Sequence, residues 1–223
     1  MQRGPIGRIR YVAGVDAAFP GGDTCLAAAV VWDVRQGEIV QTRHAVRPLR
    51  FPYVPGLLAF REALAILAAL RKLDPPIDAL MCDGHGLAHP RGFGVAWYLG
   101  VLCDLPSIGC AKSRLVREHD MPTTRRGAWT SIRHRGHIVG AVLRTKAVTN
   151  SIYVSIWHRV DLRVASALVL KCATRYRLPE PTRLADQLVS QLAHAADQQD
   201  CSRVRLGVQT RTNAVQEVRD LNE

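Results

Sequence analysis

The stretch IDALMCDGHGLAHPRGF, residues 77–93, decides the fold. It begins with an apolar run of strand length that ends at Asp83. The next nine residues contain three glycines, two histidines, a proline and an arginine. This pattern predicts a buried strand that delivers the Asp83 carboxylate into a polar loop.

The residues that follow complete a strand–helix–strand unit. The pattern predicts a helix over residues 93–103 and a short buried strand over residues 106–110, which ends near Lys112. Two strands joined by a crossover helix pair in parallel. Because ligand crevices lie outside the carboxyl ends of parallel strands, we expect Asp83 and Lys112 to share one edge of the sheet.

The composition favours one globular domain. The chain has 223 residues, of which 48% are hydrophobic, enough for one core. We expect a single domain over residues 1–223, with a core of about residues 10–192 and a loosely held tail over residues 198–223. No apolar run has the roughly 20 residues of a membrane helix and no signal-peptide pattern is present. We therefore expect a cytoplasmic protein, monomeric and without membrane contact.

The charge favours a polyanionic partner. Thirty Lys and Arg against nineteen Asp and Glu give a formal net charge of +11. The surplus is mainly arginine, which binds phosphate through a bidentate fork. The alternative is an arginine-rich, solvated surface that has no partner.

The N-terminal part predicts an antiparallel meander. Strands are expected over residues 11–19, 24–33 and 38–46, with short turns between them. Asp16 is the one charged residue of the first strand. A lone carboxylate in apolar surroundings costs several kcal/mol unless a cation meets it, so we expect a basic side chain or a metal beside Asp16.

A stiff connector and a helix follow the meander. Prolines at 48, 52 and 55 restrict the backbone and display Phe51 and Tyr53. An aromatic ring on a rigid loop can be a wedge between bases or a lid over the core. In the helix predicted over residues 57–73, Glu62 lies on the apolar, inward stripe, which is unusual for a glutamate.

The C-terminal part predicts a hairpin, a strand and two helices. The hairpin covers residues 129–143 and turns at 135–136, and the strand covers residues 151–157. A helix capped by Asp161 is expected over residues 162–176. The last helix is expected to start at Pro181 or Thr182 and carries Asp186 close to its inner stripe.

Four acids are thus expected on inward-facing or strand-end positions: Asp16, Glu62, Asp83 and Asp186. Carboxylate oxygens of this kind suit Mg²⁺ or Mn²⁺, which also bind phosphate. A carboxylate cluster in a basic protein favours phosphodiester chemistry, because the metal ions turn repelling acids into a phosphate site. The alternative is that each acid pairs with a basic side chain.

Several longer strings strengthen this interpretation. They are Val15-Asp16, residues 52–56 with Phe60-Arg61-Glu62, residues 83–86 with His89-Pro90-Arg91, residues 109–113, and residues 178–183 with Ala185-Asp186. In this order, from about residue 10 to about residue 192, the chain resembles the endonuclease V family of deoxyinosine 3′ endonucleases, and the order of its elements resembles the ribonuclease H-like α/β fold, a mixed central sheet flanked by helices.

The resemblance implies a Mg²⁺-dependent DNA repair endonuclease. It implies a nick at the second phosphodiester bond 3′ to deoxyinosine, leaving a 5′-phosphomonoester, with Mn²⁺ as a substitute metal and inosine-containing RNA as a possible second substrate. The resemblance implies that Asp16 and Asp83 hold the metal and that Glu62 and Asp186 complete the cluster. It implies that Lys112 orients water or phosphate. The implied DNA-binding residues are Pro52, Tyr53, Val54, Pro55, Gly84, His85, Gly86, His89 and Arg91, with Tyr53 as the wedge and the two glycines beside the extruded base.

Three alternatives stay open from the sequence. Cys82, His85 and His89 have a spacing that could suggest zinc. A resolvase-type or inosine-RNA-specific nuclease could use the same fold. A catalytically silent nucleic-acid-binding module is the alternative from another class. The chain also departs from many family members, because only about ten residues precede the first strand, and position 186, aspartate or histidine in the family, is aspartate here.

Overall fold

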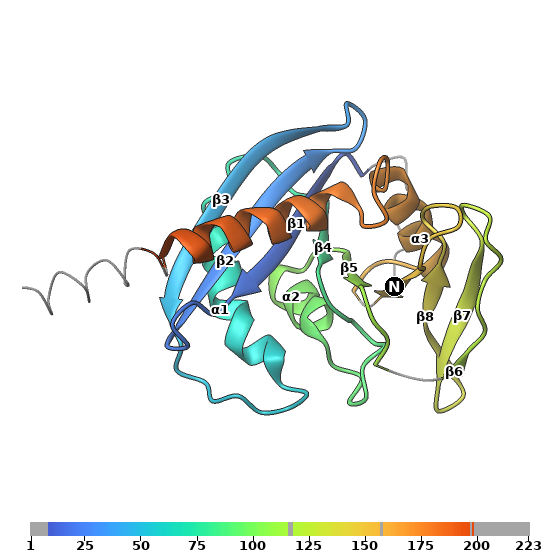
Figure 1. The fold of residues 1–223 in the computed structure, drawn as a ribbon, viewed down its shortest axis with the longest axis horizontal. Helices are drawn as coiled ribbons and strands as arrows, with labels where there is room; N and C mark the ends of the chain where they lie inside the picture. Colours follow the sequence, from blue (N-terminus) through green and yellow to red (C-terminus); the bar gives the residue numbers. More distant parts are fainter. Residues whose placement is uncertain (1–8, 116–117, 157, 197, 199–223) are drawn as a thin grey trace, which may run out of the picture.

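The computed structural model describes residues 9–115, 118–156, 158–196 and 198 (Figure 1). Its strands are β1 (Tyr11–Ala18), β2 (Thr24–Asp33), β3 (Glu38–Pro48), β4 (Ala79–Cys82), β5 (Ser107–Ala111), β6 (Glu118–His119), β7 (Trp129–His134), β8 (His137–Leu143) and β9 (Ile152–Ile156). The helices are α1 (Leu58–Leu70), α2 (Val95–Cys103) and α3 (Leu162–Cys172), and residues 180–196 form a further helix.

The described strands form one mixed sheet in the order β3-β2-β1-β4-β5-β9-β8-β7-β6. The first three strands are the expected antiparallel meander. Strand β4 pairs in parallel with both β1 and β5, which confirms the parallel unit predicted around α2. Beyond β5 the pairing is antiparallel again through β9, β8, β7 and β6.

Helices cover both faces of the sheet because side chains alternate along each strand. On one face, Ala13 and Val15 of β1 pack with α1 and α2 in a cluster that also contains Leu80. On the other face, Val12 packs with α3 residues, and Leu26 of β2 packs against Val189 of the last helix. Figure 1 shows this last helix crossing in front of β1 and β2.

One close backbone contact sets the position of the last helix. A Cβ atom on Gly14 would lie 2.1 Å from the carbonyl carbon and oxygen of Pro181. No other residue type therefore fits at position 14 without moving the start of the helix. Since side chains alternate, Gly14 and Asp16 face the same side of the sheet, the side on which this helix lies.

Most of the expected elements are present, and the differences are local. Helix α3 ends at Cys172, so the expected end at Tyr176 was wrong, whereas Asp161 does cap this helix by accepting a hydrogen bond from the Val164 amide at 2.9 Å. The hairpin turns at Arg135-Gly136, both with positive φ (49° and 79°), as a type I′ turn requires.

Two other expectations concern side chains and the ends of the chain. Phe51 was expected to be displayed, but its ring stacks on Phe60 with 5.4 Å between centroids. The five cysteines of the described residues are free, and four of them are buried. The N-terminal residues 1–8 and the expected tail from 199 onward lie outside the described residues. Among the helices that are described, none is both long and apolar enough to cross a membrane.

Candidate active site

Strand register brings the first two acids together. In the parallel pair of β1 and β4, Val15 lies opposite Cys82, so Asp16 and Asp83 are the next residues of adjacent strands. Adjacent strands lie about 4.8 Å apart. The Asp83 amide donates a hydrogen bond to the Val15 carbonyl at 3.2 Å, which continues the ladder to this point. The two carboxylates therefore emerge side by side where β4 ends.

The last helix and β5 add a third acid and a base. Asp186 belongs to the helix whose start is fixed against Gly14. Lys112 follows β5, and its Nζ lies 2.7 Å from an oxygen of Asp83 and 3.1 Å from an oxygen of Asp186. The prediction that Asp83 and Lys112 share an edge of the sheet is thereby confirmed.

Glu62 reaches the cluster from the opposite face of the sheet. It lies on α1, whereas Asp186 lies on the helix that covers the other face. The three aspartates each offer an oxygen within 4.8 Å of the others, and Glu62 is outside that group. Glu62 still interacts electrostatically with Asp16 and Asp83, so it borders the cluster without joining its central three ligands.

Burial and mutual repulsion keep two of these acids partly protonated near neutral pH. Burial, and then the charge of Asp83, raises the pKa of Asp16 to about 7. Burial, and then the charges of Asp16 and Asp83, raises the pKa of Glu62 to about 8. Burial opposes the charge of Lys112, but its contacts with Asp83 and Asp186 outweigh this and raise its pKa. The single ammonium group of Lys112 therefore does not fully neutralise the charge of the acidic cluster.

The donor set fits a hard divalent cation. Ligand oxygens on one Mg²⁺ lie at most about 4.2 Å apart, twice the metal–oxygen distance of ~2.1 Å. Oxygens of Asp16, Asp83 and Asp186 that lie within 4.8 Å of one another reach this spacing by small side-chain rotations. The Lys112 ammonium, bridging Asp83 and Asp186, already occupies this cluster as a cation. These three aspartates could therefore hold a metal, with Lys112 next to it.

A cavity of about 310 Å³ opens beside the acids. It shares Glu62 and Asp83 with the cluster, and its other walls are Tyr53, Gly56, Leu58, Ala59, Gly84, His85, His89, Pro90, Phe93, Gly94, Val95 and Leu115. Most of these walls are apolar or aromatic. The volume is at the lower end of the range for small-ligand pockets, roughly 300–1,000 Å³, and a flat heterocycle is a suitable occupant.

The proline-rich connector forms the rim of this cavity. Tyr53 is 67% exposed, and the Arg61 guanidinium lies 5.6 Å from the centre of its ring. The same guanidinium lies 4.7 Å from the ring of Phe19. Tyr53 is thus displayed on a stiff loop, next to the cavity and supported by a cation, while its neighbours Pro52 and Pro55 are also exposed.

The glycine-rich loop after β4 closes the cavity from the other side. Gly84 has a φ of 152°, which side-chain-bearing residues rarely adopt, and a Cβ there would lie 2.8 Å from Val95. The amide of Gly86 donates to the Ser155 hydroxyl at 2.5 Å, so Gly86 is explained by packing against β9. Gly84, in contrast, lines the cavity.

The two histidines of this loop are buried. His85 lies 3.0 Å through Nε2 from the Ser113 carbonyl, and burial lowers its pKa to about 4. Burial also lowers the pKa of His89, whose Nδ1 accepts from the Arg91 amide at 3.2 Å. Both histidines are therefore neutral wall residues, and Arg91 is exposed at the mouth of the loop.

The zinc alternative has no geometric support among the described residues. Cys82 is 1% exposed, and burial in β4 raises the pKa of its thiol. The one group of potential metal ligands found in residues 9–115, 118–156, 158–196 and 198 is the aspartate triad. The spacing of Cys82, His85 and His89 in the sequence therefore does not become a ligand cluster.

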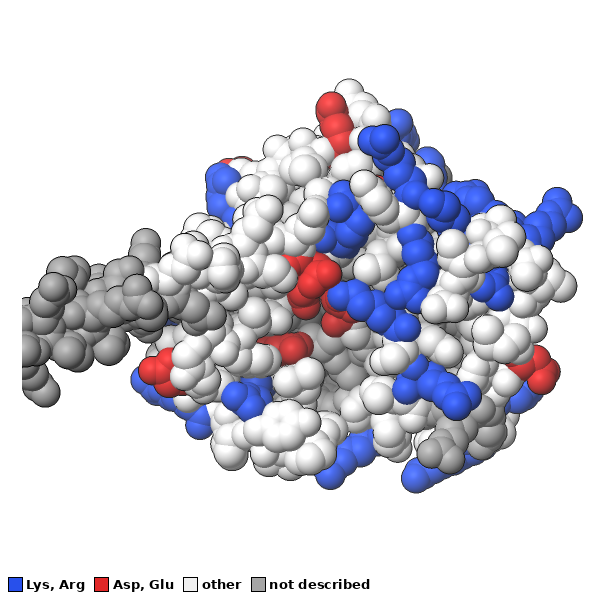
Figure 2. All heavy atoms as spheres, viewed as in Figure 1, with Lys and Arg blue, Asp and Glu red and all other residues white. Residues whose placement is uncertain are grey.

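Basic residues gather beside the acidic patch on one face. Figure 2 shows Lys and Arg gathered beside the acids at the centre of the view. Arg125, Arg133 and Arg135 are exposed. Arg126 is used internally, because its guanidinium donates to the carbonyls of Leu170 and Ala173 at 2.9 and 3.1 Å. An acidic centre within a basic surface is the electrostatic arrangement expected of a metal-dependent enzyme that acts on a polyanion.

Comparison with known proteins assigns this arrangement to a family. The family model for endonuclease V matches residues 2–187. The chain belongs to the endonuclease V family. An endonuclease V from Roseiflexus castenholzii is 57% identical over 185 residues, which are 83% of this chain and 83% of that protein. Members of the family are endonucleases, so the chain is a phosphodiester hydrolase.

Solved structures of endonuclease V share the fold. The crystal structure of endonuclease V from Streptomyces avermitilis has a TM-score of 0.83 and 43% identity, covering 87% of this chain and 86% of that one. The endonuclease V of Ciona intestinalis, 23% identical with a TM-score of 0.75 and covering 85% and 88% of the two chains, was crystallised with a 24mer DNA containing an inosine followed by a ribo-adenosine. The ribonuclease H-like fold is thus confirmed.

Sequence reasoning missed two parts of this endonuclease V site. Gly14 was not singled out, although its contact with Pro181 positions the helix that carries Asp186. Leu115 also lines the cavity, and nothing in its local sequence marks it. A glycine inside an otherwise apolar strand was the available signal for the first, because such a glycine often marks close backbone approach.

Proposed function

We propose that this member of the endonuclease V family is a Mg²⁺-dependent enzyme that recognises deoxyinosine in DNA and hydrolyses the second phosphodiester bond 3′ to it. The observation that carries the proposal is the shared wall between two features. A cavity suited to a flat base and a triad of aspartates meet at Asp83, which belongs to both. The cavity would hold the extruded base, and the aspartate triad would hold the metal beside a phosphate further along the same strand.

Each site residue has a role that follows from its place. Asp16, Asp83 and Asp186 would hold the metal, and Glu62 would contact it through water from the other face of the sheet. Lys112, next to Asp83 and Asp186, would bind a phosphate oxygen or orient the attacking water. When bound, the metal supplies Lewis acidity and a water of lowered pKa.

The cavity side would hold and expel bases. Tyr53, with Pro52, Val54 and Pro55, would insert where the inosine leaves the stack, because it is an exposed ring on a restricted loop. Gly84, His85, His89 and the apolar walls would enclose the flipped hypoxanthine. In this proposal Gly86 supports the loop against β9 and Arg91 contacts the strand at the mouth of the cavity.

Mg²⁺ is proposed as the metal, with Mn²⁺ as a substitute, because all the central ligands are carboxylate oxygens. Inosine-containing DNA is proposed as the substrate because the Ciona intestinalis relative was crystallised with it. The ribo-adenosine in that strand is a reason to include RNA in the test.

In the experiment the protein is incubated with duplexes that carry inosine, uracil or an abasic site, and with a four-way junction. Each substrate is made of DNA and, where chemistry allows, also of RNA. The expected result is a metal-dependent nick that is fastest with inosine DNA. Faster cleavage of the junction would favour a resolvase-type nuclease, and faster cleavage of inosine RNA would favour an RNA enzyme. Binding without cleavage of any substrate would favour a silent binding module.

A matched pair of variants separates chemistry from binding. Asp83→Asn removes one charge from the triad, whereas Asp74→Asn removes one charge from a 78% exposed side chain on the connection that leads into β4, at the other end of that strand. We expect Asp83→Asn to lose nicking and keep DNA binding, and Asp74→Asn to keep both. Nicking by Asp83→Asn at the wild-type rate would refute the assignment.

A further inference from the structure

The loop between α3 and the last helix presents a second exposed tyrosine ring that is backed by an arginine. Because α3 ends at Cys172, Tyr176 lies in a loop and is 51% exposed. The guanidinium of Arg183 lies 4.4 Å from the centre of the Tyr176 ring. One face of the ring is thus backed by a cation, and the side chain remains half open to solvent.

The support beneath Tyr176 is rigid. Arg183 donates through Nε and Nη2 to one carboxylate oxygen of Glu180 at 2.8 and 2.6 Å, and through Nη1 to Gln187 at 2.7 Å. Glu180 is buried. A guanidinium held by three hydrogen bonds gives the ring a fixed surface to pack on, which lowers the entropy lost when a partner stacks on that ring.

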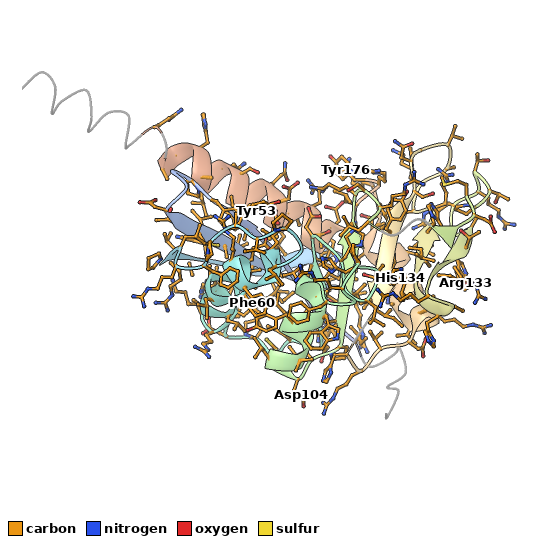
Figure 3. The ribbon with its side chains drawn as sticks, turned by 90° about the horizontal axis from the view of Figure 1, so that it is seen from below. Tyr53, Phe60, Asp104, Arg133, His134 and Tyr176 are labelled. Carbon is orange, nitrogen blue, oxygen red and sulfur yellow. The ribbon has the colours of Figure 1, made fainter. Side chains whose placement is uncertain are left out.

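This ring is attached to the metal site through the last helix. Arg183 and Asp186 are three residues apart on that helix, so they lie on the same side of it, one turn apart. Figure 3 places Tyr53 and Tyr176 on the same side of the molecule, with Tyr53 toward α1 and Tyr176 toward the half that carries Arg133 and His134. Two exposed tyrosines, each next to an arginine, therefore accompany the acidic cluster.

The charges around Tyr176 favour nucleic acid over an apolar ligand. Tyr176 lies between Arg175 and Arg177 in the sequence, and the ammonium of Lys146 lies 3.5 Å from the Arg175 carbonyl. Aromatic rings flanked by arginines bind single strands by stacking on bases while the cations contact phosphates. An acidic peptide would also be attracted to these charges, but it would not need an exposed ring held on a fixed cation.

We propose that Tyr176 is a second stacking platform, which contacts the base of the second nucleotide 3′ to inosine, just beyond the bond that is cut. This inference rests on the proposed function, because the polarity of the strand follows from it. The flipped base occupies the cavity beside Tyr53, the scissile phosphate lies at the aspartate triad, and the next nucleotide then reaches the Tyr176 side. Tyr176 positions the strand and takes no part in the chemistry.

The test uses duplexes with 2-aminopurine, a base whose fluorescence falls on stacking, at the second nucleotide 3′ to inosine or at the nucleotide 5′ to it. Ca²⁺ replaces Mg²⁺ in the binding assay to slow cleavage. Wild type, Tyr176→Ala, Tyr176→Phe and Trp129→Ala are compared; the last removes an exposed ring of β7. KM and kcat for inosine DNA are measured with Mg²⁺ on the same proteins.

We expect Tyr176→Ala to lose the fluorescence change at the 3′ position alone and to raise KM by about five- to 150-fold with kcat nearly unchanged. Tyr176→Phe and Trp129→Ala should behave as wild type. A Tyr176→Ala protein with wild-type KM and fluorescence, or one that loses the signal at both positions, would overturn the inference. If the wild type itself fails to nick inosine DNA, the proposed function is wrong, which is a separate outcome.

Discussion

The half-buried carboxylate of Asp16 should destabilise the metal-free protein at neutral and higher pH. Burial raises the pKa of this group from 3.8 to about 7 in the folded protein. Between these two values the folded state binds more protons than the unfolded state. The contribution of Asp16 to the free energy of unfolding therefore falls as pH rises from about 4 to about 7, and it is constant above pH 7.

The size of this effect follows from the shift. Each pKa unit corresponds to about 1.36 kcal/mol, so a rise of about 3 units costs about 4 kcal/mol above pH 7. Roughly a third of this stability is already lost at pH 5. About 3 kcal/mol is therefore lost between pH 5 and pH 8. Local relaxation and water penetration reduce such values, so we take about 1 kcal/mol, or ~2–4 °C in Tm, as the expected minimum.

The assay is thermal unfolding in EDTA, followed by circular dichroism at pH 5 and pH 8. Asp16→Asn removes the ionisable group and keeps its shape, and Asp74→Asn is the control because Asp74 is 78% exposed. The measured quantity is the Tm of Asp16→Asn minus the Tm of wild type. We expect this difference to be at least about 2 °C larger at pH 8 than at pH 5. The Tm of Asp74→Asn should follow that of wild type at both pH values. If the Tm difference between Asp16→Asn and wild type is the same at both pH values, the proposed burial of charge is refuted.

Three further predictions concern the base, the helix contact and the surface charge. Lys112→Ala should lower kcat for nicking by about 100-fold or more, while Lys171→Ala, on α3, keeps it; equal rates for both would contradict the role of Lys112. Gly14→Ala should lower the free energy of unfolding by about 2–3 kcal/mol in urea titrations and impair nicking, because the new Cβ meets Pro181 at 2.1 Å; a fully active, stable variant would show that the helix moves freely. The candidate phosphate contacts on the surface are Arg125, Arg133 and Arg135. For each of them that contacts phosphate, replacement by glutamine should reduce the slope of log binding constant against log salt concentration by about 1. An unchanged slope would show that the replaced arginine does not contact the DNA backbone.

The sequence predicted the part of the site that depends on strand order. An apolar run that ends at Asp83, a crossover helix and a second strand that ends near Lys112 are local patterns, and parallel pairing then places both residues at one edge. The observed distance of 2.7 Å between them confirms this reasoning. Helical spacing alone also predicted that Glu62 turns toward the interior, and Glu62 lines the cavity beside the aspartates.

The remainder depends on contacts between distant segments. The placement of Asp186 requires the last helix to cross β1, which is decided by backbone contact at Gly14 and not by any periodic pattern. The end of α3 was misjudged because residues 173–176 have no strong helix breaker, whereas Pro179 lies several residues later. The hydrogen bonds of Arg126 to the carbonyls at the end of α3 also join distant segments, and a basic loop in the sequence does not predict them.

The most direct test of the central claim is the size of the product from a 5′-labelled duplex that carries one inosine, incubated with and without Mg²⁺. The proposed function predicts a single labelled fragment that ends one nucleotide 3′ to inosine, formed with Mg²⁺ and absent with EDTA. Cleavage that is independent of inosine, or a nick at another bond, would contradict the account, as would equal activity in EDTA.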